Sequence, residues 1–349
     1  MAEDQGKDNI KVADATTFKI FIIGNRGYAS AITEKLLKKG ENVAGICSKT
    51  ESSYLILKSY LRAILVKYDV YPNNGCGYKN PFDSFRLPGD IAAESNIPYF
   101  DAAAIKTPRF KRDLQDIAPD IVLVAGFHRL IPADIIAIPK RGMINFHPSL
   151  LPKHRGGTPS RWVIRNGESE TGVTAHFINE QFDCGDIVLQ EKLAVDPNET
   201  WGELEMRISD VIARMACHIV DMTKTGPLKA LPQDENKASY ESSFRGSNQK
   251  IDWTLPAREI KLVCNAIKPK SSGISAYRGK MLCPWDIVVL DDVMSNRIAG
   301  TVLSVDGSSV LVTCGKGALK ITSFLYRGKI VDAKDIISKY DIREGVVLQ

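Results

Sequence analysis

The sequence predicts an α/β protein in two parts: a Rossmann-like, mostly parallel sheet, followed by a small OB-like β-barrel. Two apolar runs predict the sheet. Phe18–Gly24 leads through a turn and a helix to a second strand at Val43–Ser48, and Asp120–Gly126 forms a further buried strand. Strand, helix and strand in this order make the βαβ unit of parallel sheets. The final third has short apolar runs between glycine turns, which is typical of a small barrel.

The first strand, turn and helix could be taken for a nucleotide-binding motif. The helix is expected from Ala29 to Lys39 and ends at Gly40. The glycines at the turn are spaced G-x-x-G rather than G-x-G-x-x-G, and no acidic residue ends the second strand to hold a ribose. We therefore exclude a dinucleotide site and interpret the motif as a plain strand–turn–helix corner.

The middle of the chain alternates between helix and strand patterns. A helical pattern at Tyr54–Tyr68 precedes a turn-rich segment, Tyr71–Pro81, that predicts a surface loop. Thr200 can cap a long helix together with Glu203. Helices are expected at Gly89–Ser95, Pro108–Asp116, Pro132–Ile138, Ser160–Asn166 and Thr200–Lys224, and strands at Gly142–Phe146, Gly172–Ile178 and Asp186–Leu193.

The chain is expected to divide into a disordered polar tail (residues 1–17), an α/β domain (18–231) and a barrel domain (232–349). The boundary is placed at the charged stretch Pro232–Tyr240. A helix from Pro256 to Ile267 opens the second domain. Its strands are expected at Ser275–Tyr277, Asp286–Leu290, Gly300–Val305, Ser309–Cys314 and Leu319–Leu325.

The composition predicts a cytoplasmic protein without a membrane segment. Of 349 residues, 44% are apolar and 25% are charged, and the formal net charge is +5. This mild excess suits an anionic small ligand without demanding nucleic acid. The seven cysteines show no metal-ligand spacing, which predicts reduced thiols and no metal. No uncharged apolar run reaches the roughly 18 residues of a membrane span.

One stretch carries residues for acyl-transfer chemistry. Asn145 and His147 lie at the carboxyl end of an expected strand, and Asp183 follows 36 residues after the histidine, on a turn. A histidine and a carboxylate can move protons, and an amide N–H can hold a developing oxyanion. Each of the three alone could be an ordinary structural residue. Together at the carboxyl ends of neighbouring strands they predict a catalytic site.

The residues of this stretch resemble the folate-dependent formyltransferase family. The resemblance rests on N-F-H-P-S-L-L-P-K-H-R-G-G-T-P, on the spacing to F-D-C-G-D-I, and on the upstream V-L-V-A-G-F-H-R-L-I-P. It covers about residues 18–224 and continues more weakly into the β-rich tail. It implies the formyltransferase fold, and an enzyme that moves a formyl group from 10-formyltetrahydrofolate, its co-substrate, to an amine. Asn145, His147 and Asp183 match the family's catalytic trio.

The resemblance also implies which segments contact the folate. The loop after the strand at Asp120–Gly126 and the turn before Asp183 would wrap the pteridine ring, largely through backbone groups. The implied residues are His128, Arg129, Leu130, Ile131, Ile178, Asn179, Glu180 and Phe182. Arg129 could equally be a structural ion-pair partner. His176 could support His147 or Asp183, or could simply be a buried, hydrogen-bonded histidine.

A basic loop, Ser149–Gly157, closes over the site in the family. Its positive charge would suit an anionic acceptor, although an ordinary solvated basic loop has the same composition. The residues expected to face the acceptor are Ser149, Lys153, Arg155, Gly156 and Thr158.

Two acceptors remain open, a small amine and methionyl-tRNA. The tail favours tRNA because residues 240–349 hold 16 Lys and Arg against 11 Asp and Glu. Against tRNA, Lys49–Leu87 is longer and more acidic than the insertion that the tRNA enzymes of the family use. The chain also reads G-G-T-P-S-R-W where those enzymes usually read G-A-A-P-I-Q. We therefore expect a small acceptor, such as a nucleotide-linked amino sugar or an amino acid, with methionyl-tRNA as the alternative.

Two other readings share parts of the pattern. A formyltetrahydrofolate hydrolase would use the same trio and release formate without an amine. A nucleic-acid-binding protein without activity could rely on the barrel alone, but the trio is intact. No feature of the sequence sets the oligomeric state.

Overall fold

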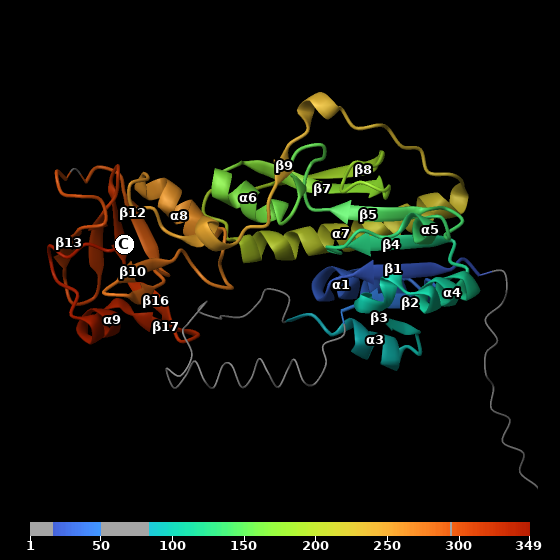
Figure 1. The fold of residues 1–349 in the computed structure, drawn as a ribbon, viewed down its shortest axis with the longest axis horizontal. Coiled ribbons are helices and arrows are strands. Elements are labelled where there is room, and N and C mark those ends of the chain that lie inside the picture. The colour runs from blue at the N-terminus through green and yellow to red at the C-terminus, as the bar shows by residue number, and fades with distance from the viewer. Residues whose placement is uncertain (1–16, 50–83, 294) are drawn as a thin grey trace, which may run out of the picture.

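The computed structural model describes residues 17–49, 84–293 and 295–349 (Figure 1). Almost the whole expected tail, the helix at 54–68 and the loop at 71–81 lie outside the described residues. Figure 1 shows a large sheet with its helices at one end of the molecule and the C-terminal strands at the other. The long helix α7 (Trp201–Thr225) runs from the sheet toward the C-terminal part.

The large sheet has seven strands in the order β3-β2-β1-β4-β5-β7-β8. The first five strands along that order run parallel, and β7 and β8 are antiparallel to their neighbours. The strands are β1 (Ile20–Gly24), β2 (Val43–Ser48), β3 (Tyr99–Asp101), β4 (Ile121–Ala125), β5 (Met143–His147), β7 (Glu170–Phe177) and β8 (Ile187–Ala194). The predicted mostly parallel α/β sheet is confirmed; the short strand β3 was not expected.

Alternate side chains of the central strands point into two separate hydrophobic cores, one on each face of the sheet. Ile20 and Ile22 of β1 pack with α7 and its neighbours on one face, whereas Phe21 and Ile23 pack on the other. This follows from the two-residue period of a strand that is buried on both sides. The remaining helices of this part are α1 (Arg26–Lys38), α3 (Pro88–Glu94), α4 (Pro108–Ile117), α5 (Ala133–Ile136) and α6 (Pro159–Asn166).

Two helix starts follow their sequence signals. The Thr200 hydroxyl accepts from the Glu203 N–H while the Glu203 carboxylate accepts from the Thr200 N–H, so the predicted capping box is confirmed. At α1, the Asn25 side chain accepts from the Tyr28 N–H. A Cβ at Gly126 would clash with that same Asn25 side chain. The corner after β1 is thus closely packed against β4.

The C-terminal part is built from short antiparallel strands around a second core. A four-stranded sheet has the order β12-β15-β14-β13, and two hairpins, β10-β11 and β16-β17, complete it. Its elements are α8 (Ala257–Asn265), β10 (Ser275–Tyr277), β11 (Lys280–Leu282), β12 (Ile287–Leu290), β13 (Val302–Val305), β14 (Val310–Thr313), β15 (Ala318–Ile321), β16 (Ser323–Tyr326), β17 (Lys329–Asp332) and α9 (Ala333–Tyr340).

The expected single strand Leu319–Leu325 is wrong. The chain leaves the four-stranded sheet at Thr322, so β15 pairs with β12 and β14 whereas β16 pairs with β17. No glycine or proline marks this change of sheet, so the sequence pattern runs through it. The domain division at residue 231 stays a prediction, and α8 packs into both cores: Ile260 belongs to the second and Val263 to the first.

Candidate active site

The site begins with the pairing of β5 and β7. Asn145 and His147 are two residues apart on β5, so their side chains leave the same face of the sheet. His176 of β7 lies directly opposite Asn145 in the antiparallel register, which places its side chain on that face as well. The strand pairing alone therefore brings an amide and two imidazoles together at the carboxyl end of β5.

Asp183 reaches this face from the turn between β7 and β8. Its backbone is left-handed, with φ of 57°, a conformation that aspartate tolerates better than most residues. Gly185 presses so closely on the chain that a Cβ there would lie 1.8 Å from the Phe177 carbonyl oxygen. The Gln233 amide then donates to the carbonyl oxygens of Asp183 and Gly185, both at 2.8 Å. The turn is thus fixed from two sides.

The three predicted catalytic residues are in contact. Asp183 Oδ1 lies 3.3 Å from His147 Nδ1 and 3.4 Å from Asn145 Nδ2, which donates to it. Asn145 Nδ2 also donates to His176 Nε2 at 3.0 Å. The Gly156 N–H donates to the other Asp183 oxygen at 2.9 Å. The carboxylate therefore sits at the centre of the cluster, with partners on both oxygens.

The hydrogen-bond partners of His147 are both acceptors. His147 Nε2 lies 2.8 Å from the His154 carbonyl oxygen, which can only accept, and Nδ1 faces a carboxylate. The imidazolium form of His147 would donate to both. Burial opposes the ionisation of Asp183, but the charge and hydrogen bond of His147, together with the hydrogen bond from the Gly156 N–H, hold the pKa of Asp183 far below its usual range. An ionised Asp183 thus faces a histidine placed to carry a proton.

The loop after β5 folds tightly onto β7. The Ser149 hydroxyl donates to the Lys153 carbonyl at 2.7 Å, and the Thr174 hydroxyl of β7 donates to the Ser149 carbonyl at 2.6 Å. Ser149 is fully buried, so it shapes the loop from within. Lys153 is exposed, and it alone of these residues presents its side chain to solvent.

The basic loop was expected to offer positive charge to the acceptor, but two of its three basic residues, His154 and Arg155, are buried. Arg155 is fully buried, and its guanidinium donates to Gln233, Glu235 and Tyr240. The two ring nitrogens of His154 face Glu241 and Glu168 at 3.1 and 3.0 Å. Side chains of the protein itself therefore hold His154 and Arg155 in place. Most of these partners lie between Gln233 and Glu241, so the two side chains anchor the basic loop to that segment.

This anchoring predicts a pH-dependent stability. The hydrogen bond to Glu168 raises the pKa of His154, burial opposes the rise, and Glu241 adds to it. The stabilisation from a raised histidine pKa is complete below the unfolded value of 6.5 and is lost as pH rises through the folded value. We expect His154→Gln to lower the melting temperature most at acidic pH and least at alkaline pH. A difference that grows with pH would contradict this assignment.

The segments expected to contact folate border the cluster. Ile131 is buried and Ile178 half-buried in the same core, whereas Leu130 and Phe182 are exposed by 44% and 49%. Desolvation and the charge of Arg245 lower the pKa of His128, although its side chain reaches solvent. The other expected residues lie as follows: Arg129 is exposed and donates to the Ala102 carbonyl at 3.5 Å, and Asn179 and Glu180 are exposed on the turn.

A segment just after residue 232, for which the sequence predicted no functional role, holds the site together. The charged stretch Pro232–Tyr240 is predicted to be a domain boundary, yet its residues Gln233, Glu235 and Tyr240, with the following Glu241, hold the basic loop and the Asp183 turn. β9 (Tyr240–Glu241) even pairs with β6 (Arg155–Gly156) in parallel. A Cβ on Gly156 would lie 2.6 Å from the Glu241 carbonyl oxygen, so glycine permits this approach. The one feature of the sequence that could have indicated this role is the high proportion of polar and charged residues in the segment.

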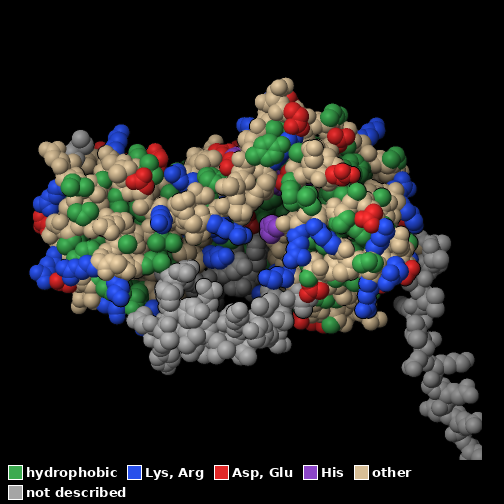
Figure 2. Space-filling view, viewed as in Figure 1, with side chains coloured by type: hydrophobic (Ala, Val, Ile, Leu, Met, Phe, Trp, Pro, Cys, Tyr) green, Lys and Arg blue, Asp and Glu red, His purple; other side chains and the backbone are tan. Residues whose placement is uncertain are grey.

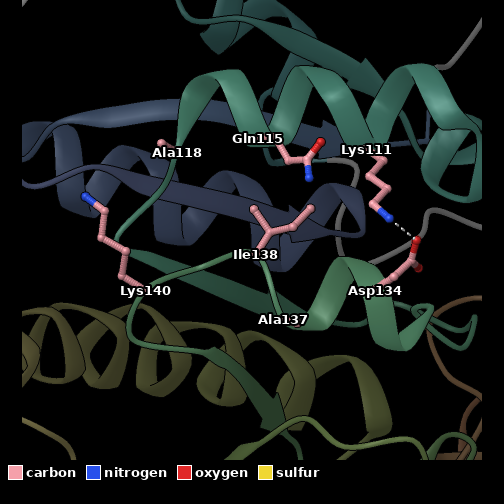
Figure 3. A pocket seen from close by; sticks show the side chains of 7 residues that line it. All are labelled: Lys111, Gln115, Ala118, Asp134, Ala137, Ile138 and Lys140. Atoms are coloured by element: carbon pink, nitrogen blue, oxygen red, sulfur yellow. Dashed lines mark hydrogen bonds and ion pairs between the residues drawn. The ribbon is translucent and has the colours of Figure 1, made fainter.

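A separate surface pocket lies away from the cluster. Figure 3 shows it between α4 and the chain around α5, where Lys111 reaches Asp134 at 2.7 Å. It is lined by Lys111, Gln115, Ala118, Asp134, Ala137, Ile138 and Lys140, none of which is an expected site residue. Within the described residues, no group of His, Cys, Asp and Glu is arranged to hold a metal, and no helix is long and apolar enough to cross a membrane.

The Formyl transferase family model matches residues 18–220, and the model of the formyl transferase C-terminal domain matches residues 245–341. The chain belongs to the formyl transferase family. The expectations of the family and of an enzyme are confirmed.

Relatives by sequence include methionyl-tRNA formyltransferases. The protein of Alkaliphilus oremlandii is 29% identical over 331 residues, covering 95% of this chain and 99% of its own. That of Pelotomaculum thermopropionicum is 32% identical over 254 residues, covering 72% of this chain and 81% of its own.

Two solved structures share the fold at low identity. The N-formyltransferase from Helicobacter canadensis, in complex with folinic acid and dTDP-3-aminofucose, matches with a TM-score of 0.63 and 17% identity, covering 88% of this chain and 100% of that chain. HypX from Aquifex aeolicus, in complex with tetrahydrofolic acid, matches with a TM-score of 0.59 and 15% identity, covering 92% of this chain. This chain spans about half of HypX, 47% of its length.

Proposed function

We propose that this enzyme transfers the formyl group of 10-formyltetrahydrofolate to the amino group of methionyl-tRNA. One observation carries the choice of acceptor: a methionyl-tRNA formyltransferase aligns with 95% of this chain, including the C-terminal strands. The expected small acceptor has less support, because the amino-sugar enzyme resembles this chain at only 17% identity. The small amine therefore becomes the competing acceptor in the test.

The trio would act at the formyl carbon. The amine attacks that carbon and a tetrahedral oxyanion forms. Its collapse breaks the bond to the folate nitrogen, which takes up a proton and leaves as tetrahydrofolate. His147 as the imidazolium and the Asn145 amide are the nearby donors that could stabilise the oxyanion; in other enzymes one such donor contributes roughly 3–4 kcal/mol. In the structure Asn145 Nδ2 donates to His176 and Asp183, and His147 Nε2 faces the His154 carbonyl. Both side chains would therefore exchange one of these partners for the oxyanion when the formyl donor binds. Asp183, ionised, accepts the proton that the amine releases, directly or through water.

The folate would lie between the loop after β4 and the turn before Asp183. Ile131 and Ile178 belong to one core, so the two segments share an apolar base. Leu130 and Phe182 expose apolar surface above it. A flat heteroaromatic ring fits such a slot when backbone N–H and C=O groups line its edge. His176, which contacts both Asn145 and Asp183, would position them rather than touch the substrate.

The acceptor is tested by comparing turnover. We expect folate release and acceptor formylation with methionyl-tRNA, and none with uncharged tRNA, because the methionyl amine is the nucleophile. A dTDP-linked amino sugar and free ornithine serve as small-amine arms, and product masses identify the formylated species. Formylation of a small amine without tRNA, at a rate methionyl-tRNA does not approach, would reject the proposed acceptor. Folate release without any amine would indicate a hydrolase instead.

A further inference from the structure

A buried cation just beyond the catalytic loop has no ion-paired acid among the residues that the structure describes. Arg161 is in the first turn of α6, five residues after Gly156, and is only 5% exposed. Its guanidinium stacks on Trp201, 3.7 Å from the ring centroid, but among the described residues it forms no side-chain hydrogen bond or ion pair. Burial lowers the pKa of Arg161 to about 10, and the nearby Glu205 opposes this shift. A buried guanidinium with unused donors is unusual.

Glu205 does not satisfy the guanidinium. Its two carboxyl oxygens accept from the hydroxyl groups of Tyr28, at 2.6 Å, and Ser160. The indole N–H of Trp201 donates to the Ser160 oxygen at 3.2 Å. This network joins α1, α6 and α7 in the buried layer beside Arg161. It fixes the ring on which Arg161 stacks, and it uses the Glu205 oxygens without a hydrogen bond from the guanidinium among the described residues.

Two further cations are brought to Arg161 by neighbouring contacts. Phe244 packs edge-on against Trp162, with ring centroids 5.1 Å apart, and its N–H donates to the Thr158 hydroxyl. These two contacts of Phe244 place the next residue, Arg245, near the start of α6. A Cβ at Gly202, next to Trp201, would lie 2.2 Å from Pro269, and Lys270 follows that proline.

The charges of Arg161 and Arg245 both act on Lys270. Desolvation, followed by the charges of Arg161 and Arg245, lowers the pKa of Lys270. Arg245 and Lys270 are exposed, and within the described part of the chain neither has an acidic partner. Arg245 also acts on His128 of the loop after β4, which ties the cluster to the proposed folate side of the site. Figure 2 shows Lys and Arg side chains gathered along the hollow between the two parts of the molecule.

We propose that Arg161, Arg245 and Lys270 bind a phosphate group of the acceptor. Three neighbouring cations, one of them buried and without a hydrogen-bonded partner among the described residues, match the charge and the oxygens of a phosphate. The site lies where α6 begins, next to the loop whose Gly156 N–H holds Asp183, so it would anchor the acceptor while its amine reaches the formyl carbon. The source of the phosphate rests on the proposed function: a tRNA backbone or, alternatively, a nucleotide-linked amine carries the same group.

The direct test is binding of inorganic pyrophosphate, measured by calorimetry without any acceptor. We expect Arg161→Gln to weaken binding roughly tenfold or more, since charge-assisted hydrogen bonds are lost. Arg112→Gln is the matched control, because Arg112 is exposed on α4, which packs on the opposite face of the sheet. If Arg161→Gln fails to fold, the exposed Arg245→Gln and Lys270→Gln carry the same expectation.

Kinetics then identify the source of the phosphate. With methionyl-tRNA and with a dTDP-linked amino sugar, Arg161→Gln should raise KM for the true acceptor, with kcat and the KM for the formyl donor little changed. Pyrophosphate binding that depends on Arg161 without turnover of methionyl-tRNA would support the site and reject the proposed acceptor. Wild-type pyrophosphate affinity in all three variants, together with an unchanged acceptor KM, would overturn the site.

Discussion

Asp183→Asn is expected to reduce turnover by roughly 10³-fold, the scale of a lost general base. The asparagine keeps the size of the side chain and can still accept from the Gly156 N–H. It loses the charge that faces His147, and it cannot take the proton of the attacking amine. The measurement is kcat with saturating formyl donor and acceptor. His147→Ala should cause a comparable loss, because the proton-carrying partner is removed.

The structural contribution of Asp183 is separated from its chemistry by two readouts. Thermal melting should show a folded variant, and the affinity for the formyl donor should remain near that of the wild type. His176→Gln is the comparison, since it retains a hydrogen-bonding group beside Asn145 without an imidazole. We expect a smaller loss there than in Asp183→Asn. Turnover close to the wild-type rate in folded Asp183→Asn or His147→Ala would refute the assigned roles.

Arg155→Ala is expected to cost about 2–3 kcal/mol of unfolding free energy. The guanidinium is fully buried and fills its donors with Gln233, Glu235 and Tyr240. Truncation leaves these acceptors without their donor. Glu235 is 67% exposed and can be hydrated, which places the loss at the lower end for a broken buried pair. Chemical denaturation measures it.

Lys153→Ala is the matched control for this loop. Lys153 is two residues away, carries the same charge and is exposed, so its loss should change stability by less than about 0.5 kcal/mol. Arg155→Ala should also reduce turnover, because Gln233 holds both Arg155 and the carbonyls around Asp183. Equal stability losses in the two variants would show that Arg155 acts through its charge alone.

Much of the fold followed from local patterns in the sequence. The apolar run at β4 and the Thr200–Glu203 capping pair each specify an element without help from distant residues. The break at Thr322 did not follow, since β15 and β16 differ only in which strand pairs with them. The strand ends there because β15 and β16 pair with different strands of the C-terminal part. A continuous run of β-branched and apolar residues does not show which strand each half will pair with.

The site was predictable where strand geometry governs it. The i and i+2 spacing of Asn145 and His147 places them on one face, and both lie in a long motif. The clamp from Gln233 to Glu241 was not predictable, because its partners lie about 50 to 85 residues earlier in the chain. For the same reason the sequence predicts that Arg155 faces the acceptor. The sequence shows only a basic loop, whereas the side chains that bind the Arg155 guanidinium come from a segment about 80 residues later.

One measurement tests the central claim most directly: the fate of an isotopically labelled formyl group in a single turnover. Enzyme in excess is mixed with labelled 10-formyltetrahydrofolate and methionyl-tRNA, and the reaction is quenched at intervals. We predict that the label leaves the folate and appears on the methionyl amine at the same rate, and that Asp183→Asn slows both together. Label released as free formate, or transfer that is equally fast in Asp183→Asn, would contradict formyl transfer by this trio.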